Sequence, residues 1–343
     1  MKNPSQTTNY GRIYLLLAIA IFGAANAVTR KLTELGAQNL VDGRNPISFC
    51  NVLFVGNLCA LLFLSLIYYR QWRIPLLRQI STKNWLTMAV VAILGAVVVP
   101  TLVFTALDLT NVNNVILLGQ IDTPLVLALS VWLLSERINR WVVAGAIVSF
   151  IGVALTVILQ PPPSDAVSMG MGIEIGRGEL YVLIAAVFKA VANLISKMSL
   201  QQIPLGIFSG FRMLVGTIVF FLATIVLYGT DHFMDVTSPF LWQWMLLYSA
   251  VIVVGGQLLW FSGLKRSNAS EVSFATAFNP LAGILAAYLL LGEVPTTAQY
   301  IGGAVILCGI ALNQIGVRKL SKTASRKKKA EPEMDEAIAF KGI

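Results

Sequence analysis

Ten stretches of about 20 predominantly apolar residues constrain the fold of this chain more than any other feature. A helix of that length crosses the hydrocarbon core of a bilayer, where every backbone polar group must be satisfied within the segment itself. Of the 343 residues, 57% are hydrophobic and only 12% are charged, which is far from the balance of a soluble domain. We therefore expect an all-α integral membrane protein with ten transmembrane helices. Their expected bounds are 13–35, 46–68, 84–107, 112–135, 140–159, 179–199, 205–228, 240–263, 271–291 and 297–317.

The chain also repeats itself at fixed spacings. Gly11, Tyr14, Asn26 and Arg30 are followed much later by Gly178, Tyr181, Asn193 and Lys197. Glu136, Gly145 and Gly152 are likewise followed by Glu293, Gly302 and Gly309. Each copy holds five of the expected spans, and an odd number of crossings places the second copy upside down relative to the first. Inverted repeats of this kind are typical of secondary transporters, with the substrate site at the interface between the repeats.

The repeat divides the chain into five segments. We expect a polar tail at 1–10, a first five-helix repeat at 11–159, a proline- and glycine-rich linker at 160–177, a second five-helix repeat at 178–317, and a charged tail at 318–343. The first span is too long for a signal peptide and has no small-residue cleavage site, so we expect it to remain as a helix. The three cysteines fall inside spans at spacings that indicate neither a disulfide nor a metal site, and we expect no cofactor.

The distribution of basic residues predicts the orientation. With the N-terminus in the cytoplasm, most of the 25 Lys and Arg residues lie in cytoplasmic loops and in the C-terminal tail. The positive-inside rule therefore predicts cytoplasmic termini. This orientation, with no cleaved signal expected, suits a bacterial inner membrane. The net charge of +9 comes mainly from these segments and does not indicate nucleic acid. The basic run 326–329 is suited to anionic lipid, although the acidic residues that follow it favour a solvated tail.

Two long tracts carry a family resemblance. One runs from Leu109-Thr110 through Asp122-Thr123-Pro124 to Leu133-Leu134-Ser135-Glu136, and the other from Asn279-Pro280 to Leu291-Gly292-Glu293 and on through Gly302 and Gly309. They resemble the two EamA domains of the drug/metabolite transporter superfamily, over nearly the whole chain apart from the tails and the linker. The resemblance implies a ten-helix inner-membrane carrier with a central cavity, which most commonly exports amino acids or other small metabolites. The resemblance also extends to relatives that transport nucleotide-sugars or phosphorylated sugars in eukaryotic organelles.

Polar residues on the first and sixth spans are candidates to line a transport pathway. Lys189, Asn193, Ser196 and Lys197 share one helical face, and Phe22, Asn26, Thr29 and Arg30 form the matching stripe in the first repeat. Lys189 is deep in its span and is replaced by Phe22 in the other repeat, so the symmetry is broken at that point. The asparagines either line the pathway or hydrogen-bond neighbouring helices, and Arg30 and Lys197 are close enough to span ends to reach the headgroups.

Further candidates lie near prolines in the middle of the membrane. Asp122 is the only acid well inside a span, which suits it to proton coupling or to pairing with Lys189; a structural ion pair or a helix cap is the alternative. Gln120 precedes Asp122 and is a further candidate. Thr276, Asn279 and Pro280 of the second repeat are the counterparts of Gln120, Thr123 and Pro124, and Asn279 is the candidate among them. Two more candidates, each with a packing role as the alternative, are Trp260 as a cavity wall and Arg212, which resembles an arginine often found in the family's second span.

These residues favour transport over other functions. The single histidine, His232, falls in an expected loop, and no candidate nucleophile, paired acid or metal ligand set stands near Asp122, so we do not expect an enzyme. A channel or a receptor is the alternative from another class. The excess of Arg30, Lys189, Lys197 and Arg212 over one deep acid favours a carboxylate-bearing solute, an amino acid or organic acid, with a sugar phosphate or nucleotide-sugar as second candidate. The sequence carries no signal for an oligomeric state.

Overall fold

The computed structural model describes residues 4–41, 43–134, 139–160, 167–168, 174–200, 202–228, 236–264, 266–267, 275–316 and 319. Several sequence predictions concern residues outside these ranges: those for His232, for Glu136, for the first three residues, for most of the linker and for nearly all of the C-terminal tail. The side chain of Lys197 also falls outside the description.

The described residues form the expected membrane-spanning bundle. Nine of the described helices are long and apolar enough to cross a bilayer, and α14 is a shorter apolar helix. The helices of the first half are α1 (Pro4–Gln38), α2 (Phe49–Ile67), α4 (Thr82–Ala92), η2 (Ile93–Val98), α5 (Val99–Leu109), α6 (Val112–Gly119), α7 (Asp122–Leu134) and α8 (Arg140–Ile158). Those of the second half are α9 (Arg177–Ser199), α10 (Leu205–Tyr228), α11 (Pro239–Tyr248), η4 (Ser249–Gly255), α12 (Gly256–Leu264), α14 (Asn279–Leu291) and Thr297–Gly316. The predicted fold class is confirmed.

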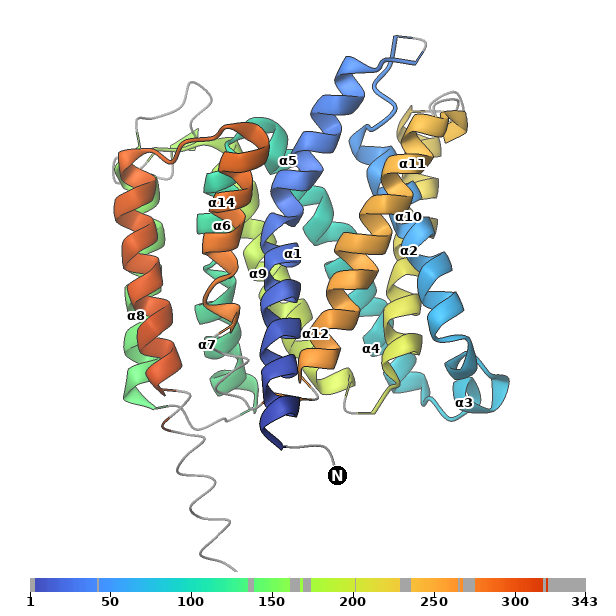
Figure 1. The fold of residues 1–343 in the computed structure, drawn as a ribbon, viewed down its shortest axis with the longest axis horizontal. Helices are drawn as coiled ribbons and strands as arrows, with labels where there is room; N and C mark the ends of the chain where they lie inside the picture. Colours follow the sequence, from blue (N-terminus) through green and yellow to red (C-terminus); the bar gives the residue numbers. More distant parts are fainter. Residues whose placement is uncertain are drawn as a thin grey trace, which may run out of the picture.

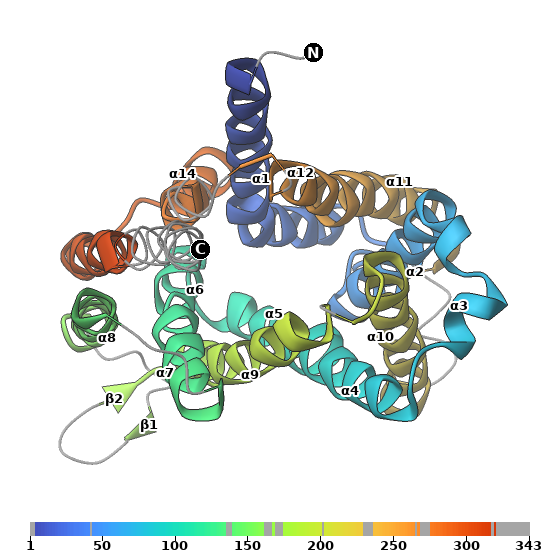
Figure 2. The same ribbon diagram turned by 90° about the horizontal axis from the view of Figure 1, so that it is seen from below.

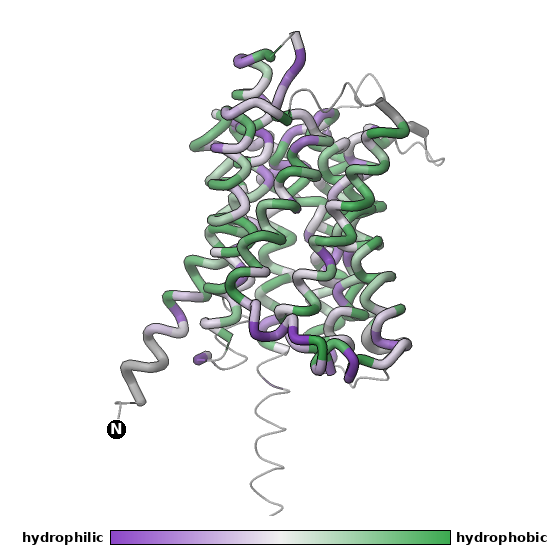
Figure 3. The backbone as a smooth tube through the Cα atoms, turned by 90° about the vertical axis from the view of Figure 1, so that its right-hand side faces the viewer, coloured by the Kyte–Doolittle hydropathy of each residue, from purple (hydrophilic) through white to green (hydrophobic). Residues whose placement is uncertain are grey.

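Successive spans run in opposite directions, so the two halves are inverted. The first helix, α1, starts at the end of the bundle where Thr297–Gly316 finishes, and its counterpart α9 starts at the opposite end (Figure 1). Apolar residues occupy most of the length of the helices, and hydrophilic residues gather at the two ends (Figure 3). This banding is what a bilayer requires of the surface that it surrounds.

The two halves interlock rather than lying side by side. In the first half, α1 packs against α12 and α14 of the second half, and in the second half α9 packs against α5 and α7 of the first. The second helices of the halves, α2 and α10, pack against each other. Figure 2 shows the helices arranged around a central axis, with α1 and α12 facing α5 and α9. The largest buried apolar cluster therefore draws residues from both halves, among them Ala27, Val115, Val182 and Ala287.

Glycines bring α8 and the helix Thr297–Gly316 into backbone contact. A Cβ atom added to Gly152 would lie 2.8 Å from the Gly302 carbonyl oxygen, and one added to Gly302 would lie 2.7 Å from the Gly152 carbonyl oxygen. Gly145 and Gly309 face each other in the same way. Small residues at such contacts permit the close packing on which helix association in membranes depends.

Four spans are interrupted near the middle of the bundle, in matching pairs. The fourth span breaks at Gln120 and Ile121, between α6 and α7, and the ninth has a turn at Ala277 and Phe278 just before α14. Pro124 and Pro280 lie in the first turn of the helix that follows each break, where the missing N–H is tolerated. The third and eighth spans contain the π-helical segments η2 and η4 at corresponding places. Such π-helical turns occur frequently at functional sites.

Two segments differ in detail from the sequence expectation. The helix α1 begins at Pro4, inside the segment expected to be a polar tail, because no glycine or proline interrupts residues 5–10. In the linker, β1 (Val167–Ser168) and β2 (Glu174–Ile175) form a short antiparallel pair. Two short helices, η1 (Tyr69–Gln71) and α3 (Ile74–Arg78), follow α2.

Candidate functional site

A central cavity lies where helices of both halves meet. Its larger compartment has a volume of about 280 Å³ and is lined by residues of α1, α5, α6, α9 and α11. The walls are mostly apolar and include Val99, Pro100, Val103 and Phe104 of α5. A row of α9 residues, Val182, Ala185 and Ala186, faces them. Both halves of the chain therefore contribute to one binding space, as expected for a site at a repeat interface.

A smaller and more polar compartment adjoins the first. It has a volume of about 170 Å³, and its polar lining residues are Asn26, Gln120, Lys189 and Asn279. The two compartments share Asn26, Lys189, Val115 and Gly119, so they are contiguous. Four of the residues that the sequence singled out are thus brought together around one space.

An ion pair lies beside the junction of the compartments. The Lys189 Nζ atom is 2.8 Å from Oδ2 of Asp122, with 50% of the Lys189 side chain and 14% of the Asp122 side chain exposed. The Thr123 hydroxyl donates a 3.1 Å hydrogen bond to Oδ1 of Asp122. The pair joins α9 of the second half to α7 of the first. Each charge compensates the other at a depth where an isolated charge is costly.

The helix interruptions place two amides at the polar compartment. Gln120 occupies the break between α6 and α7, and its Nε2 atom donates a 3.2 Å hydrogen bond to the Ile116 carbonyl. Asn279 is the first residue of α14, and its buried Oδ1 atom has no hydrogen-bond partner among the described residues. An unpaired buried acceptor is uncommon in a folded protein and calls for an explanation such as a ligand.

One lining residue, Tyr248, was not identified from the sequence, whereas its partner Thr29 belongs to the predicted stripe of the first span. The hydroxyls of Thr29 and Tyr248 are 3.1 Å apart and form a hydrogen bond between α1 and α11. Both residues line the larger compartment. Tyr248 and Ser249 form a polar step about halfway along an otherwise apolar span, and this signal could have identified the position.

Three predicted site residues lie away from the two compartments. Asn193 is exposed, one turn beyond Lys189 on α9. Trp260 packs edge-to-face on Phe22, with ring centroids 6.4 Å apart, and so stands behind a residue that lines the smaller compartment. Arg212 lies close to Gly95, where an added Cβ atom would be 3.9 Å from its Cζ atom. The Arg212 Nε atom is buried without a hydrogen-bond partner among the described residues.

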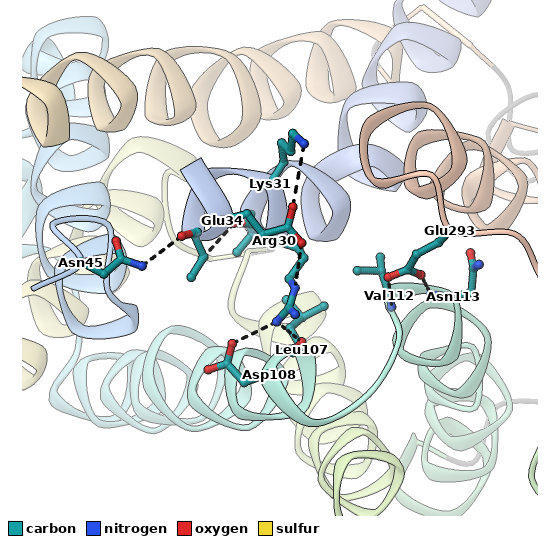
Figure 4. A network of polar contacts seen from close by, with 11 residues as sticks. Arg30, Lys31, Glu34, Asn45, Leu107, Asp108, Val112, Asn113 and Glu293 are labelled. Carbon is teal, nitrogen blue, oxygen red and sulfur yellow. Dashed lines mark hydrogen bonds and ion pairs between the residues drawn. The ribbon is translucent and has the colours of Figure 1, made fainter. Parts of the chain in front are cut away.

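A charged network links helices at the linker end of the cavity. Arg30 of α1 donates a 2.7 Å hydrogen bond to the Leu107 carbonyl and a 3.2 Å hydrogen bond to Asp108, both on α5, while its Nε atom lies 3.4 Å from Glu34 (Figure 4). Leu107 also lines the larger compartment. Arg30 therefore joins α1 to α5 beside that compartment instead of extending to the headgroups.

Two further polar groups hold the halves together at the same end. The Glu293 carboxylate accepts hydrogen bonds from the backbone N–H groups of Val112 and Asn113, at 3.1 and 3.2 Å, and so caps α6. Asn114 donates a 2.8 Å hydrogen bond to Glu179 and accepts one of 2.6 Å from Gln299. These contacts connect α6 of the first half to the second half and lie outside the two compartments.

The family model of the EamA-like transporter family matches this chain twice, at residues 9–158 and 176–314. A protein of Synechocystis sp. named "Uncharacterized transporter sll1164" is 45% identical over 333 residues, covering 96% of this chain and 95% of that protein. A Salmonella typhimurium protein named "Probable amino-acid metabolite efflux pump" is 29% identical, covering 56% of this chain and 64% of its own length. A solved crystal structure with 18% identity aligns over 92% of this chain and 99% of its own, with a TM-score of 0.55, and is similar in fold.

Proposed function

The chain belongs to the EamA-like transporter family, and from this premise we propose that it exports small metabolites, specifically amino acids or related organic acids, by alternating access. The chain is an integral multi-pass membrane protein of a family of transporters. Beyond this family membership, we propose the class of solute, the direction of transport and the mechanism.

The proposed class of solute rests mainly on Lys189. Its side chain lines both compartments, at the point where α9 approaches α1, α5 and α6. A cation inside the bilayer is costly to maintain and usually serves a function. An ammonium at a cavity wall binds a carboxylate through a charge-assisted hydrogen bond. The name of the Salmonella relative, a probable amino-acid metabolite efflux pump, supports the same class of solute.

The second candidate is a sugar phosphate or a nucleotide-sugar. A phosphate would also bind Lys189, but compartments of about 280 and 170 Å³ favour a smaller solute than a nucleotide-sugar. A channel or a receptor is a candidate from another class. The paired interruptions of the fourth and ninth spans, next to a site between inverted repeats, favour a carrier instead.

The moving parts of the proposed mechanism are the two repeats, at 11–159 and 178–317, which would rock about the central cavity. Asp122, which pairs with Lys189 across the two halves, is the proposed site of proton coupling in the cycle.

The proposed location is the bacterial inner membrane, with both termini in the cytoplasm. This follows from the basic residues in the loops at the end of the bundle where α1 starts. The proposed partners are the solute and the lipid bilayer, including anionic lipid near the basic tail.

Counterflow in proteoliposomes tests the proposal. Vesicles loaded with a mixture of amino acids, organic acids and sugar phosphates are diluted into trace labelled solutes, and the accumulation of each label is measured. We expect accumulation of an amino or organic acid, loss of it in Lys189→Ala, and retention of it in the matched control Lys83→Ala, which alters an exposed residue at the start of α4. Accumulation of sugar phosphates alone would favour the second candidate. Absence of accumulation of every solute, with folded protein in the membrane, would contradict the carrier.

A further inference from the structure

We propose that the two compartments divide the substrate between them, and that the solute is a zwitterionic amino acid with an uncharged, apolar side chain. The smaller compartment would hold the amino and carboxylate groups, and the larger one the side chain. This inference rests on the proposed transport function and narrows its solute.

The smaller compartment has the groups that a zwitterion needs. The Lys189 ammonium and the Asn26 amide can donate hydrogen bonds to a carboxylate. The unpaired Asn279 Oδ1 atom and the Asp122 carboxylate can accept hydrogen bonds from an ammonium. Donors and acceptors therefore line one space of about 170 Å³, and the Asp122 carboxylate lies at its edge, 2.8 Å from the Lys189 Nζ atom.

The ion pair is the reason to choose a zwitterion over a simple carboxylate. A substrate carboxylate that binds Lys189 competes with Asp122, which is 2.8 Å from the Lys189 Nζ atom. If the substrate brought only a negative charge, Asp122 would be left with an uncompensated charge inside the membrane, which is strongly unfavourable. An ammonium group on the same substrate replaces the lost partner of Asp122. The zwitterion thus exchanges one internal ion pair for two pairs and leaves no charge alone.

The larger compartment selects the side chain. Its walls are formed largely by Val99, Val103, Phe104 and Val182, with Ala185 and Ala186. A charged side chain placed against these walls would lose its hydration without finding a partner, whereas an apolar side chain gains from burial. Asn26 and Lys189 stand where this compartment meets the smaller one, and its other polar groups, the Thr29 and Tyr248 hydroxyls, already bond to each other.

Gly119 marks the passage between the compartments. It lines both of them, and a Cβ atom added to it would meet no atom within 4 Å. A larger residue there would extend into open space and narrow the passage without colliding with the protein at its first carbon. Gly56 offers a matched control on α2, because a Cβ atom there would lie 3.8 Å from the Met245 sulfur, an ordinary contact.

The test is competition against counterflow of labelled leucine by a matched series of solutes. The series removes one feature at a time: 4-methyl-2-oxopentanoate lacks the amine, 3-methylbutylamine lacks the carboxylate, and lysine and aspartate carry charged side chains. We expect each to compete at least about 10-fold more weakly than leucine, since each leaves a charge-assisted hydrogen bond unmade or a charge unpaired. Equal competition by the oxo acid would overturn the zwitterion, and equal competition by lysine or aspartate would overturn the apolar compartment.

Two variants separate the parts of the inference. Asp122→Asn should reduce the preference for leucine over its oxo acid, because the partner of the ammonium is gone. Gly119→Val should weaken competition by leucine much more than competition by glycine, while Gly56→Ala leaves the ratio unchanged. An unchanged leucine-to-glycine ratio in folded Gly119→Val would overturn the divided site. Exchange of other solutes but not leucine would overturn this inference and leave the carrier intact, whereas no exchange of any solute would overturn the proposed function itself.

Discussion

Lys189 and Asp122 form a 2.8 Å ion pair, and each charge makes the other tolerable inside the membrane. Lys189→Ala leaves an uncompensated carboxylate, but the Lys189 side chain is half exposed, so we expect the free energy of unfolding to fall by about 1–3 kcal/mol and transport to be lost. In the double variant Lys189→Met, Asp122→Leu no charge is left alone, so we expect most of the stability to return without transport. Thermal unfolding in detergent, followed with counterflow, measures the two effects separately. Transport at the original rate by the double variant would show that neither charge binds the solute.

A variant of Tyr248 tests whether its hydroxyl group contributes to stability and to solute affinity in addition to its aromatic ring. Tyr248→Phe removes the hydrogen bond to Thr29 and keeps the aromatic wall. We expect a loss of about 0.5–1.5 kcal/mol in stability and a modest change in apparent solute affinity, of at most about 10-fold. The matched control is Tyr300→Phe, since 61% of Tyr300 is exposed. A complete loss of transport in a stable Tyr248→Phe protein would mean that the hydroxyl binds the solute directly.

Single residues of the candidate site could be predicted from the sequence where their pattern lies within one helix. The stripe that contains Lys189, and its repeat partner with Asn26, are visible because residues at helical spacing share a face. Tyr248 and Thr29 were not predicted as a pair, because their contact depends on how α1 packs against the eighth span. Asn193 follows the same stripe as Lys189, yet it lies outside both compartments because they lie beside the half of α9 that precedes it. Its role on the pathway stays a prediction.

At the scale of elements, the contact between α8 and the helix Thr297–Gly316 depends on the absence of side chains. Gly152→Leu would place its first carbon 2.8 Å from the Gly302 carbonyl oxygen, so the helices must separate. We expect a loss of stability of at least about 1–3 kcal/mol, as for other overpacked positions. Thermal unfolding in detergent measures it, and Ala304→Leu, on the exposed face of the same helix pair, should have little effect. Equal stability of the two variants would contradict the close packing.

The spans were predictable from hydropathy, and their interruptions only in part. Pro124 and Pro280 indicate the breaks in the fourth and ninth spans, because proline removes a backbone donor. The π-helical segments η2 and η4 leave no comparable signal, since one extra residue in a turn does not alter an apolar run. Both segments adjoin the cavity, through Val99 and Pro100 after η2 and Tyr248 before η4. They therefore determine how α5 and α11 present their side chains to the cavity.

At the scale of the whole molecule, inversion follows from counting, because two copies of five spans must face opposite ways. The interlocking of the two halves could not be predicted from the number of spans. It depends on the packing of α1 and of α9 against the opposite half of the chain. The residue spacings within one repeat do not indicate this packing. That exchange is why Lys189 of the second half meets Asp122 of the first, and why the cavity belongs to neither half alone.

The orientation of this bundle in the membrane is a prediction that labelling can check. Arg70, Arg73, Arg78 and Lys83 lie in or beside the short helix α3, at the end of the bundle where α1 starts. By the positive-inside rule that end faces the cytoplasm. In a Cys308→Ser background, which removes the exposed cysteine while the buried Cys50 and Cys59 remain, single cysteines are introduced at the exposed residues Asn39 and Gln79. We expect an impermeant maleimide to label Asn39→Cys in intact cells, and Gln79→Cys only after permeabilisation. The reverse pattern would invert the topology, and it would place the Arg30 network, rather than the α3 end, on the cytoplasmic side from which an exporter must load its solute.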